Sequence, residues 1–197
     1  MFLFVLFSFI VDKDHLHQFD FDTTVRLQGD VPAKLDGPFS FLSDLGSFEP
    51  MLIVVIALVA YLLFRKKWLS FFIIGAFGLI HVAELYGKRV VEQHPPPQFL
   101  LRTQNIFNFP QFHVREEFSY PSGHAGRAMF ITVLVGLLVW RSKKIPQKAK
   151  YIIIAILIAY DFVMILSRVS LGEHWTTDVI GGAILGVSLA FFSAVLL

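Results

Sequence analysis

Long apolar runs alternate with short polar segments along most of the chain. Five runs approach the roughly 20 residues that a helix needs to cross the hydrocarbon core of a bilayer. These runs are Phe48–Phe64, Trp68–Tyr86, Ala125–Trp140, Tyr151–Leu166 and Val179–Leu197. The last contains a GxxxG pair, Gly182 and Gly186, which favours close packing against another helix. The pattern predicts an all-α, polytopic membrane helix bundle.

A sixth run, Met1–Val11, is apolar throughout but about half the usual length of a span. A signal peptide is the competing interpretation. The run lacks a basic segment before it and a small-residue cleavage site after it, which favours a short first span. We therefore expect about six transmembrane helices in a single domain, 1–197.

The Lys and Arg residues of the loops predict the orientation of these helices. Basic residues gather in Arg65-Lys66-Lys67 and in the 141–150 segment RSKKIPQKAK, and short loops of this kind face the cytoplasm. With six spans, both termini are then cytoplasmic. The outer loop 87–124 and the segment 168–178 consequently share the outer face.

The segment 12–50 is expected to lie at the outer interface. It holds eight Asp and Glu against three Lys and Arg. Between Gln18 and Leu45, apolar residues recur among these charges, and Pro32 and Pro38 interrupt the pattern. Such a segment is typical of short interfacial helices.

The composition narrows the possible functions. Of the 197 residues, 55% are hydrophobic and 16% charged, whereas soluble domains are about a quarter charged. A net charge of +2 gives no basic excess for nucleic acid, and the apolar excess predicts that the chain sits in the lipid bilayer. The absence of cysteine excludes disulfides, zinc-thiolate sites and thiol nucleophiles. Nothing in the composition indicates an oligomeric state.

Ionisable residues near the outer ends of the spans form three clusters. Because such residues are costly in lipid, they mark a candidate functional site. The clusters are His81, Glu84 and Lys88 on one helix face, Tyr120–His124 before the fourth span, and Ser167-Arg168 followed by Gly172–Asp178. Glu84 precedes Lys88 by four residues, a spacing that suits an ion pair. Asp161 lies in the middle of a span, about 10 Å from Arg168 by helical rise, and is expected to pair with another helix.

Each cluster suggests part of a phosphoryl chemistry. Ser122-Gly123-His124 predicts a turn into a helix N-terminus, where N–H groups and the macrodipole favour an anion. His174 and Asp178 are spaced i, i+4, so on a helix the carboxylate holds one imidazole nitrogen and leaves the other as nucleophile or base. The residues Lys88 and Arg168 supply cationic donors. Taken singly, each has a structural interpretation, such as headgroup anchoring of Arg168, but together they predict an anionic substrate.

Two of these motifs resemble those of the type 2 phosphatidic acid phosphatase superfamily of membrane lipid phosphatases. The third motif of that family, Ser-Arg, five residues, His, three residues and Asp, corresponds here to Ser167-Arg168, His174 and Asp178. The second, Pro-Ser-Gly-His, corresponds to Pro121–His124. The segment Phe21–Phe48 looks like the stretch that precedes the second span in the family.

The first motif departs from the family pattern of Lys, six residues and Arg-Pro. Counted from Lys88, the Arg position is Pro95. His94 is the closest replacement and is predicted as a phosphate-binding residue. Other candidates are Arg89, Arg102 and Arg127, of which Arg127 lies one helical turn after His124.

The resemblance implies a catalytic role for each motif residue. His174 attacks phosphorus and forms a phosphohistidine, while Asp178 fixes its tautomer. His124 protonates the leaving oxygen and then activates water. Charge on the phosphoryl oxygens is stabilised by Lys88, Ser122, the Gly123 amide and Arg168. The expected mechanism uses no metal and no cofactor.

The expected function is hydrolysis of a lipid phosphate or diphosphate at the outer face. Undecaprenyl diphosphate, phosphatidylglycerophosphate and phosphatidic acid all fit. One alternative is action on a soluble phosphate ester or phosphate transfer to another acceptor. A second is a non-catalytic lipid-phosphate binding or transport protein, and a third is a small channel with an acidic vestibule. Small size and short loops suit a prokaryotic inner membrane.

Overall fold

A computed structural model describes residues 1–103 and 118–197, in which helices are joined by loops and no strand occurs. The outer loop 87–124 therefore lies partly outside the described residues. The helices are α1 (Phe2–Asp12), α2 (His17–Asp30), α3 (Asp36–Leu45), α4 (Phe48–Phe64), α5 (Phe72–Val90), α6 (Gly123–Arg141), α7 (Gln147–Ser170) and α8 (Thr176–Val195). Short 3-10 turns cover Ala33–Leu35, Trp68–Phe71 and Gln98–Leu100. The expected all-α class is confirmed.

The apolar runs became helices, but several helices extend beyond the runs. The helix α5 continues past Tyr86 to Val90, and α7 continues past Leu166 to Ser170. Lys88 and Arg168 are therefore helical residues, and both are buried. The apolar runs end before these helices do, because the last turn of each helix directs polar side chains into the protein interior and not into lipid.

Four helical segments in the described chain are long and apolar enough to cross a membrane: Trp68–Val90, Gly123–Arg141, Gln147–Ser170 and Thr176–Val195. Helices α3 and α4 pass the same test together, although the pair is bent by 48°. The helix Phe2–Asp12 is apolar but shorter. The protein is therefore a multi-pass helix bundle, while the number of six spans and the orientation stay predictions.

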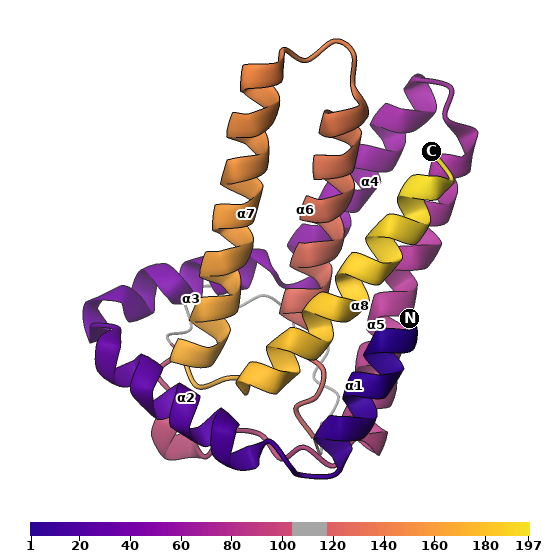
Figure 1. Ribbon diagram of the computed structural model, residues 1–197. Helices are drawn as coiled ribbons and strands as arrows, with labels where there is room; N and C mark the ends of the chain where they lie inside the picture. The colour runs from indigo at the N-terminus through magenta and orange to yellow at the C-terminus, as the bar shows by residue number, and fades with distance from the viewer. Residues whose placement is uncertain (104–117) are drawn as a thin grey trace.

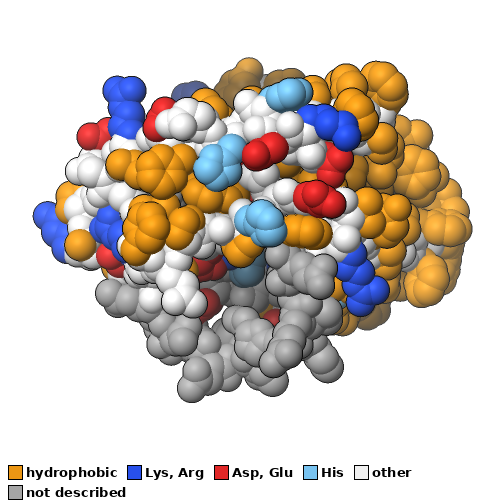
Figure 2. Space-filling model, turned by 90° about the horizontal axis from the view of Figure 1, so that it is seen from below, with side chains coloured by type: hydrophobic (Ala, Val, Ile, Leu, Met, Phe, Trp, Pro, Cys, Tyr) orange, Lys and Arg blue, Asp and Glu red, His pale blue; other side chains and the backbone are white. Residues whose placement is uncertain are grey.

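The long helices stand side by side, and α2 and α3 lie across one end of the bundle (Figure 1). The segment 12–50, the chain after α5, the start of α6 and the α7–α8 connection all meet at this end (Figure 1). Seen from this end, charged and histidine side chains gather on the surface, whereas the flank is apolar (Figure 2). The structure thus brings together the segments that were expected to share a face, and α2 and α3 are the short helices expected between Gln18 and Leu45.

Close packing of α6 against α8 fixes the centre of this arrangement. A Cβ atom added to Gly186 would lie 2.2 Å from the carbonyl oxygen of Gly126, and one added to Gly182 would lie 2.2 Å from that of Ser122. Any side chain at either position would push the helices apart. The predicted role of the GxxxG pair in packing is confirmed, and this contact sets the second motif beside the third.

Apolar side chains fill the interior of the bundle and also cover its outside. Phe77, Ile80, Phe130 and Leu134 are at most 1% exposed and form the core between α5, α6 and their neighbours. The outward positions of α7 are also apolar, and they are exposed: Ile152, Ile156, Ile158 and Phe162. An apolar outer surface on a well-packed core is what a lipid environment requires.

Asp161 lies away from the polar end and accepts a hydrogen bond from the hydroxyl of Thr132 on α6, at 2.8 Å. The expectation that it pairs with another helix is confirmed. This contact satisfies a polar group inside the bundle and joins α6 to α7.

Candidate active site

A cavity of about 640 Å³ opens at the polar end of the bundle. Its wall brings together residues from α3 to α7, the chain after α5 and the α7–α8 connection. The ionisable lining residues are Asp44, Glu49, His81, Glu84, Lys88, His124, Arg127, Arg168, Glu173 and His174. Three cations and three histidines thus share a small volume, which suits a group with several oxygen atoms and negative charge.

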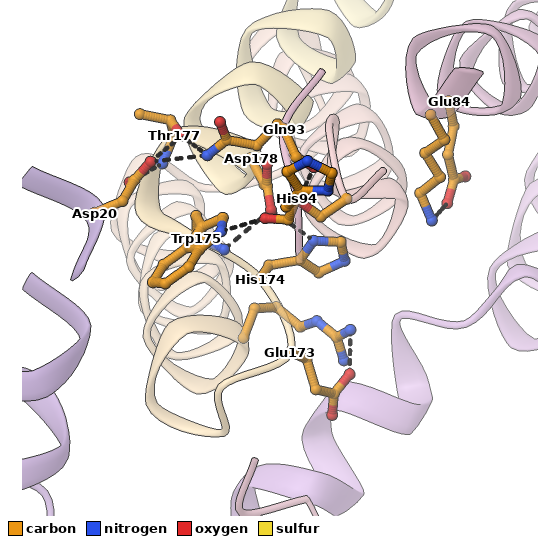
Figure 3. Close-up of polar contacts among 12 residues, drawn as sticks. Asp20, Glu84, Gln93, His94, Glu173, His174, Trp175, Thr177 and Asp178 are labelled. Atoms are coloured by element: carbon orange, nitrogen blue, oxygen red, sulfur yellow. Dashed lines mark hydrogen bonds and ion pairs between the residues drawn. The ribbon is translucent and has the colours of Figure 1, made fainter. Parts of the chain in front are cut away.

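His174 is held by Asp178 at the edge of this cavity (Figure 3). Its Nδ1 lies 3.2 Å from Oδ2 of Asp178, which is fully buried. The same Oδ2 accepts the backbone N–H of Trp175 at 3.0 Å. Because this contact uses Nδ1, Nε2 is the nitrogen available for chemistry.

The contact between His174 and Asp178 arises differently from the expected geometry on one helix. Trp175 is extended and is the N-cap of α8, so His174 lies before the helix and Asp178 in its first turn. Asp178 accepts the Trp175 N–H, which is the half of a capping box that the N3 carboxylate supplies. The two side chains still meet because the carboxylate turns back toward the chain that enters the helix.

A second carboxylate, from a distant part of the chain, fixes the N-terminus of α8. Asp20 of α2 accepts the Thr177 backbone N–H at 2.9 Å and also accepts from the Thr177 hydroxyl and from Nε2 of Gln93 (Figure 3). Burial raises the pKa of Asp20 above its ordinary value, and these hydrogen bonds oppose the shift. No sequence signal distinguished Asp20 from the other acids of 12–50.

Replacing Asp20 with asparagine is expected to destabilise the protein and to lower activity modestly. The amide turns one acceptor into a donor among existing donors, so the unfolding free energy should fall by about 1–3 kcal/mol. Activity should fall several-fold because α8 carries Asp178. Denaturant unfolding in detergent and phosphate release measure both effects, with exposed Asp22→Asn as the matched control. Equal stability of the two variants would contradict the role of Asp20.

His124 begins the first turn of α6, which starts at Gly123 after the N-cap Ser122. This is the turn into a helix N-terminus that the motif predicted. The Nε2 atom of His124 lies 3.3 Å from the hydroxyl of Ser47 and lines the cavity. Ser122 is fully buried, and its hydroxyl has no hydrogen-bond partner within the described chain. Neither Ser122 nor Gly123 is part of the cavity wall, although both directly precede His124, which is. The Ser122 N–H donates to the carbonyl of Asp178, which ties the two motifs together.

Glu84 connects the cationic side chains of α5 and α6. One carboxylate oxygen lies 3.4 Å from Nζ of Lys88, and the other lies 2.6 Å from Nη1 of Arg127 and 3.5 Å from Nδ1 of His81. The predicted pair of Glu84 and Lys88 is confirmed. Glu84 makes its shorter contact with Arg127, which comes from another helix.

Arg168 forms the other side of the cationic group. Its guanidinium pairs with Glu173 and donates to the hydroxyl of Ser43 on α3. Glu173 also accepts from Thr103 at 2.5 Å. The sequence analysis did not single out Ser43, Thr103 or Glu173, although Glu173 lies directly before His174.

The residues proposed to replace the missing first-motif arginine lie in different places. His94 is exposed, and its side chain is not part of the cavity wall; its carbonyl accepts the indole N–H of Trp175 at 2.6 Å. Arg102 binds both carboxylate oxygens of Asp36, at 3.0 and 2.7 Å. Arg89 is exposed, whereas Arg127 is buried in the wall.

The arrangement favours covalent phosphoryl chemistry. His174 is oriented by a carboxylate, and His124, Lys88 and Arg168 line the same cavity. Burial lowers the pKa of His174 below its ordinary value of 6.5, and the charges of Arg168 and Lys88 lower it further, so the ring is neutral and nucleophilic. No cluster of three or more potential metal ligands occurs in the described ranges.

Comparisons with known proteins give relatives that are named as phosphatases. Residues 65–197 match the PAP2 superfamily. Phosphatidylglycerophosphatase B of Bacillus subtilis is 26% identical over 76% of this chain and 69% of its own length. Undecaprenyl-diphosphatase of Sulfolobus acidocaldarius is 33% identical over 82% of this chain and 70% of its own length.

Two solved structures share the fold. A transmembrane PAP2-type phosphatidylglycerolphosphate phosphatase from Bacillus subtilis superimposes with a TM-score of 0.77 and 22% identity, over 98% of this chain and 90% of that one. LpxE of Aquifex aeolicus gives a TM-score of 0.63 and 23% identity, over 89% and 94% of the two chains.

Proposed function

Because the chain belongs to the PAP2 superfamily, we propose that it is a membrane phosphatase that hydrolyses a lipid phosphate or diphosphate through a phosphohistidine intermediate. The observation that carries this proposal is the pairing of His174 with Asp178 in a cavity that also contains His124, Lys88 and Arg168. A protein that only binds lipid phosphate has no need for an oriented imidazole and a second histidine beside it.

In the first step, Nε2 of His174 attacks phosphorus. An N–P bond forms, the P–O bond to the leaving group breaks, and protonated His124 gives its proton to the leaving oxygen. Asp178 keeps the proton on Nδ1 and offsets the positive charge that develops on the ring. The lipid alcohol, or the lipid monophosphate from a diphosphate substrate, then leaves.

In the second step, neutral His124 takes a proton from water as the oxygen attacks phosphorus. The N–P bond breaks, and inorganic phosphate and neutral His174 are released. Lys88, Arg168, Ser122 and the N-terminal amide of α6 at Gly123 stabilise the charge on the phosphoryl oxygens in both steps. These fixed cations and dipoles supply the charge stabilisation that metal ions supply in many phosphoryl-transfer enzymes.

The position of the cavity supports a lipid substrate. It lies at the polar end of the bundle, whose flank is apolar (Figure 2), so a lipid tail can stay in the bilayer while the headgroup enters. The relatives named for phosphatidylglycerophosphate and undecaprenyl diphosphate support these lipids as substrates, with phosphatidic acid as a third. The proposed location is a prokaryotic inner membrane, with the cavity facing outward.

Phosphate release by the purified protein in detergent tests the proposal. The substrates are the three lipids and, separately, a soluble phosphate ester, and each is assayed in the presence of EDTA, which removes divalent metal ions. Release from a lipid that exceeds release from the soluble ester and survives EDTA is the expected result. Turnover of the soluble ester alone, or lipid binding without turnover, would contradict the proposal.

The kcat/KM value is expected to rise with pH and to reach its plateau below pH 6.5. The active form of His174 is neutral, and burial and the charges of Arg168, Lys88 and Arg127 lower its pKa, with Glu84 acting in the opposite sense. Activity is therefore lost on the acid side as the pH falls through this lowered pKa, and on the basic side as His124 loses the proton that it gives to the leaving oxygen. The profile of kcat/KM against pH measures this acid limb, after correction for the ionisation of the substrate phosphate, which 31P NMR gives. A remaining acid limb at or above pH 6.5 would contradict the assignment.

A further inference from the structure

The cavity wall contains a third cation that the family motifs do not assign. A phosphoryl group in transfer spreads negative charge over three non-bridging oxygens, and Lys88 and Arg168 are the two motif cations beside His174. We infer that Arg127 is the third phosphate-binding cation of this site, in place of the arginine that is missing at Pro95. This inference rests on the proposed phosphatase function.

The positions of the basic side chains favour Arg127 over the other candidates. Arg89 and His94 are exposed, and neither side chain is part of the wall. The guanidinium of Arg102 is committed to Asp36 and to the carbonyl of Gln28. Arg127 is 4% exposed and lines the cavity together with His124 and His174.

The contacts of Arg127 hold its guanidinium in a fixed orientation. Its Nη1 binds Glu84 at 2.6 Å, and its Nε donates to the carbonyl of Gly46 at 3.3 Å. A guanidinium carries five N–H donors, so it can keep both contacts and still donate to an oxygen in the cavity. Because Arg127 follows His124 by one helical turn, the acid–base residue and this cation move as one unit.

Glu84 makes it possible for two cations to lie together. Its carboxylate contacts Lys88 and Arg127 with different oxygens, at 3.4 and 2.6 Å, which offsets their repulsion. The carboxylate of Glu84 also lies against the start of α6: a Cβ atom added to Gly123 would come within 2.1 Å of it. Two cations and a helix N-terminus around one carboxylate form an anion-binding arrangement made from the chain itself.

The inference is tested by replacing Arg127 and measuring phosphate release and inhibition by inorganic phosphate. Arg127→Gln should lower kcat/KM by about 100-fold or more, as expected when one charged donor to a developing oxyanion is lost. Arg127→Lys keeps the charge but not the planar fork, so a loss of about 10-fold is expected. In both variants the inhibition constant for inorganic phosphate should rise.

A second substitution separates phosphate binding from a purely structural tether. Pro95 also lines the cavity, so Pro95→Arg places a guanidinium in the same wall. In the Arg127→Gln background it should restore at least part of kcat/KM and of the affinity for inorganic phosphate. If Arg127 only linked Glu84 to Gly46, an arginine at position 95 would not restore activity, because it would not remake those two contacts. Arg89→Gln, an exposed arginine on α5, is the matched control and should leave activity unchanged.

The results distinguish this inference from the proposed function. If the parent protein releases no phosphate from any lipid, the proposed function fails first. If the parent is active and Arg127→Gln matches it, or Pro95→Arg restores nothing, Arg127 is not the third cation. If Arg127→Gln and Arg127→Lys both fail to fold, Arg127 is a structural residue and the inference is overturned.

Discussion

His174→Ala is expected to abolish phosphate release, with a loss of at least about 10⁴-fold in kcat. The imidazole is the proposed nucleophile, and its Nδ1 contact with Asp178 leaves Nε2 for attack on phosphorus. Alanine has no group that can form the N–P bond. The variant should also fail to form an acid-labile, base-stable phosphoprotein with 32P-labelled lipid, whereas the parent should form one.

The control for this variant is His15→Ala, because His15 is exposed on the segment between α1 and α2. It should retain parental activity and phosphoprotein formation. Folding is checked by the unfolding midpoint in detergent. A folded His174→Ala protein that still forms an acid-labile phosphoprotein would assign the nucleophile to another residue.

Asp178→Asn is expected to lower kcat by about 10³–10⁴-fold, close to the loss seen when the carboxylate of a catalytic triad becomes an amide. Asp178 accepts from Nδ1 of His174 and from the Trp175 N–H with the same oxygen. The neutral amide no longer offsets the positive charge on the ring when its oxygen takes the place of Oδ2, and when its NH₂ group takes that place instead, this group faces Nδ1. That contact favours the tautomer with a proton on Nε2, which removes the lone pair needed for attack.

The matched control for Asp178→Asn is Asp161→Asn, since both are buried aspartates in long helices. Asp161 contacts Thr132 and lies away from the cavity, so its variant should change activity by less than about two-fold. The rate of phosphoprotein formation in a rapid quench measures the affected step directly. Equal rates in the two variants would show that Asp178 does not orient the nucleophile.

Local spacing was enough to predict most helices and several contacts of the site. The apolar runs gave α4 to α8, because about 20 consecutive apolar residues without a polar face have few stable alternatives to a helix in lipid. Glu84 and Lys88 meet because four residues make one helical turn. The contact between His174 and Asp178 was also predicted, although His174 lies before α8 and only Asp178 is in the helix.

Residues whose role depends on distant partners could not be predicted in the same way. His94 is next to the position of the missing arginine in sequence, but its side chain lies outside the cavity wall. Arg127 is far from that position in sequence, yet it meets Glu84 because α6 packs beside α5. Asp20 supports the N-terminus of α8 from a helix at the other end of the chain.

The sequence by itself determined the helical class, the apolar exterior and the identities of the two complete motifs. These properties follow from interactions over one or two helical turns and from transfer of side chains into lipid, both of which are local. The tertiary structure decided which helix faces meet and therefore which cations, carboxylates and histidines share the cavity. That choice depends on close packing between distant segments, such as the approach of Gly186 to Gly126: the local GxxxG pattern predicts that α8 packs closely but does not specify its partner helix.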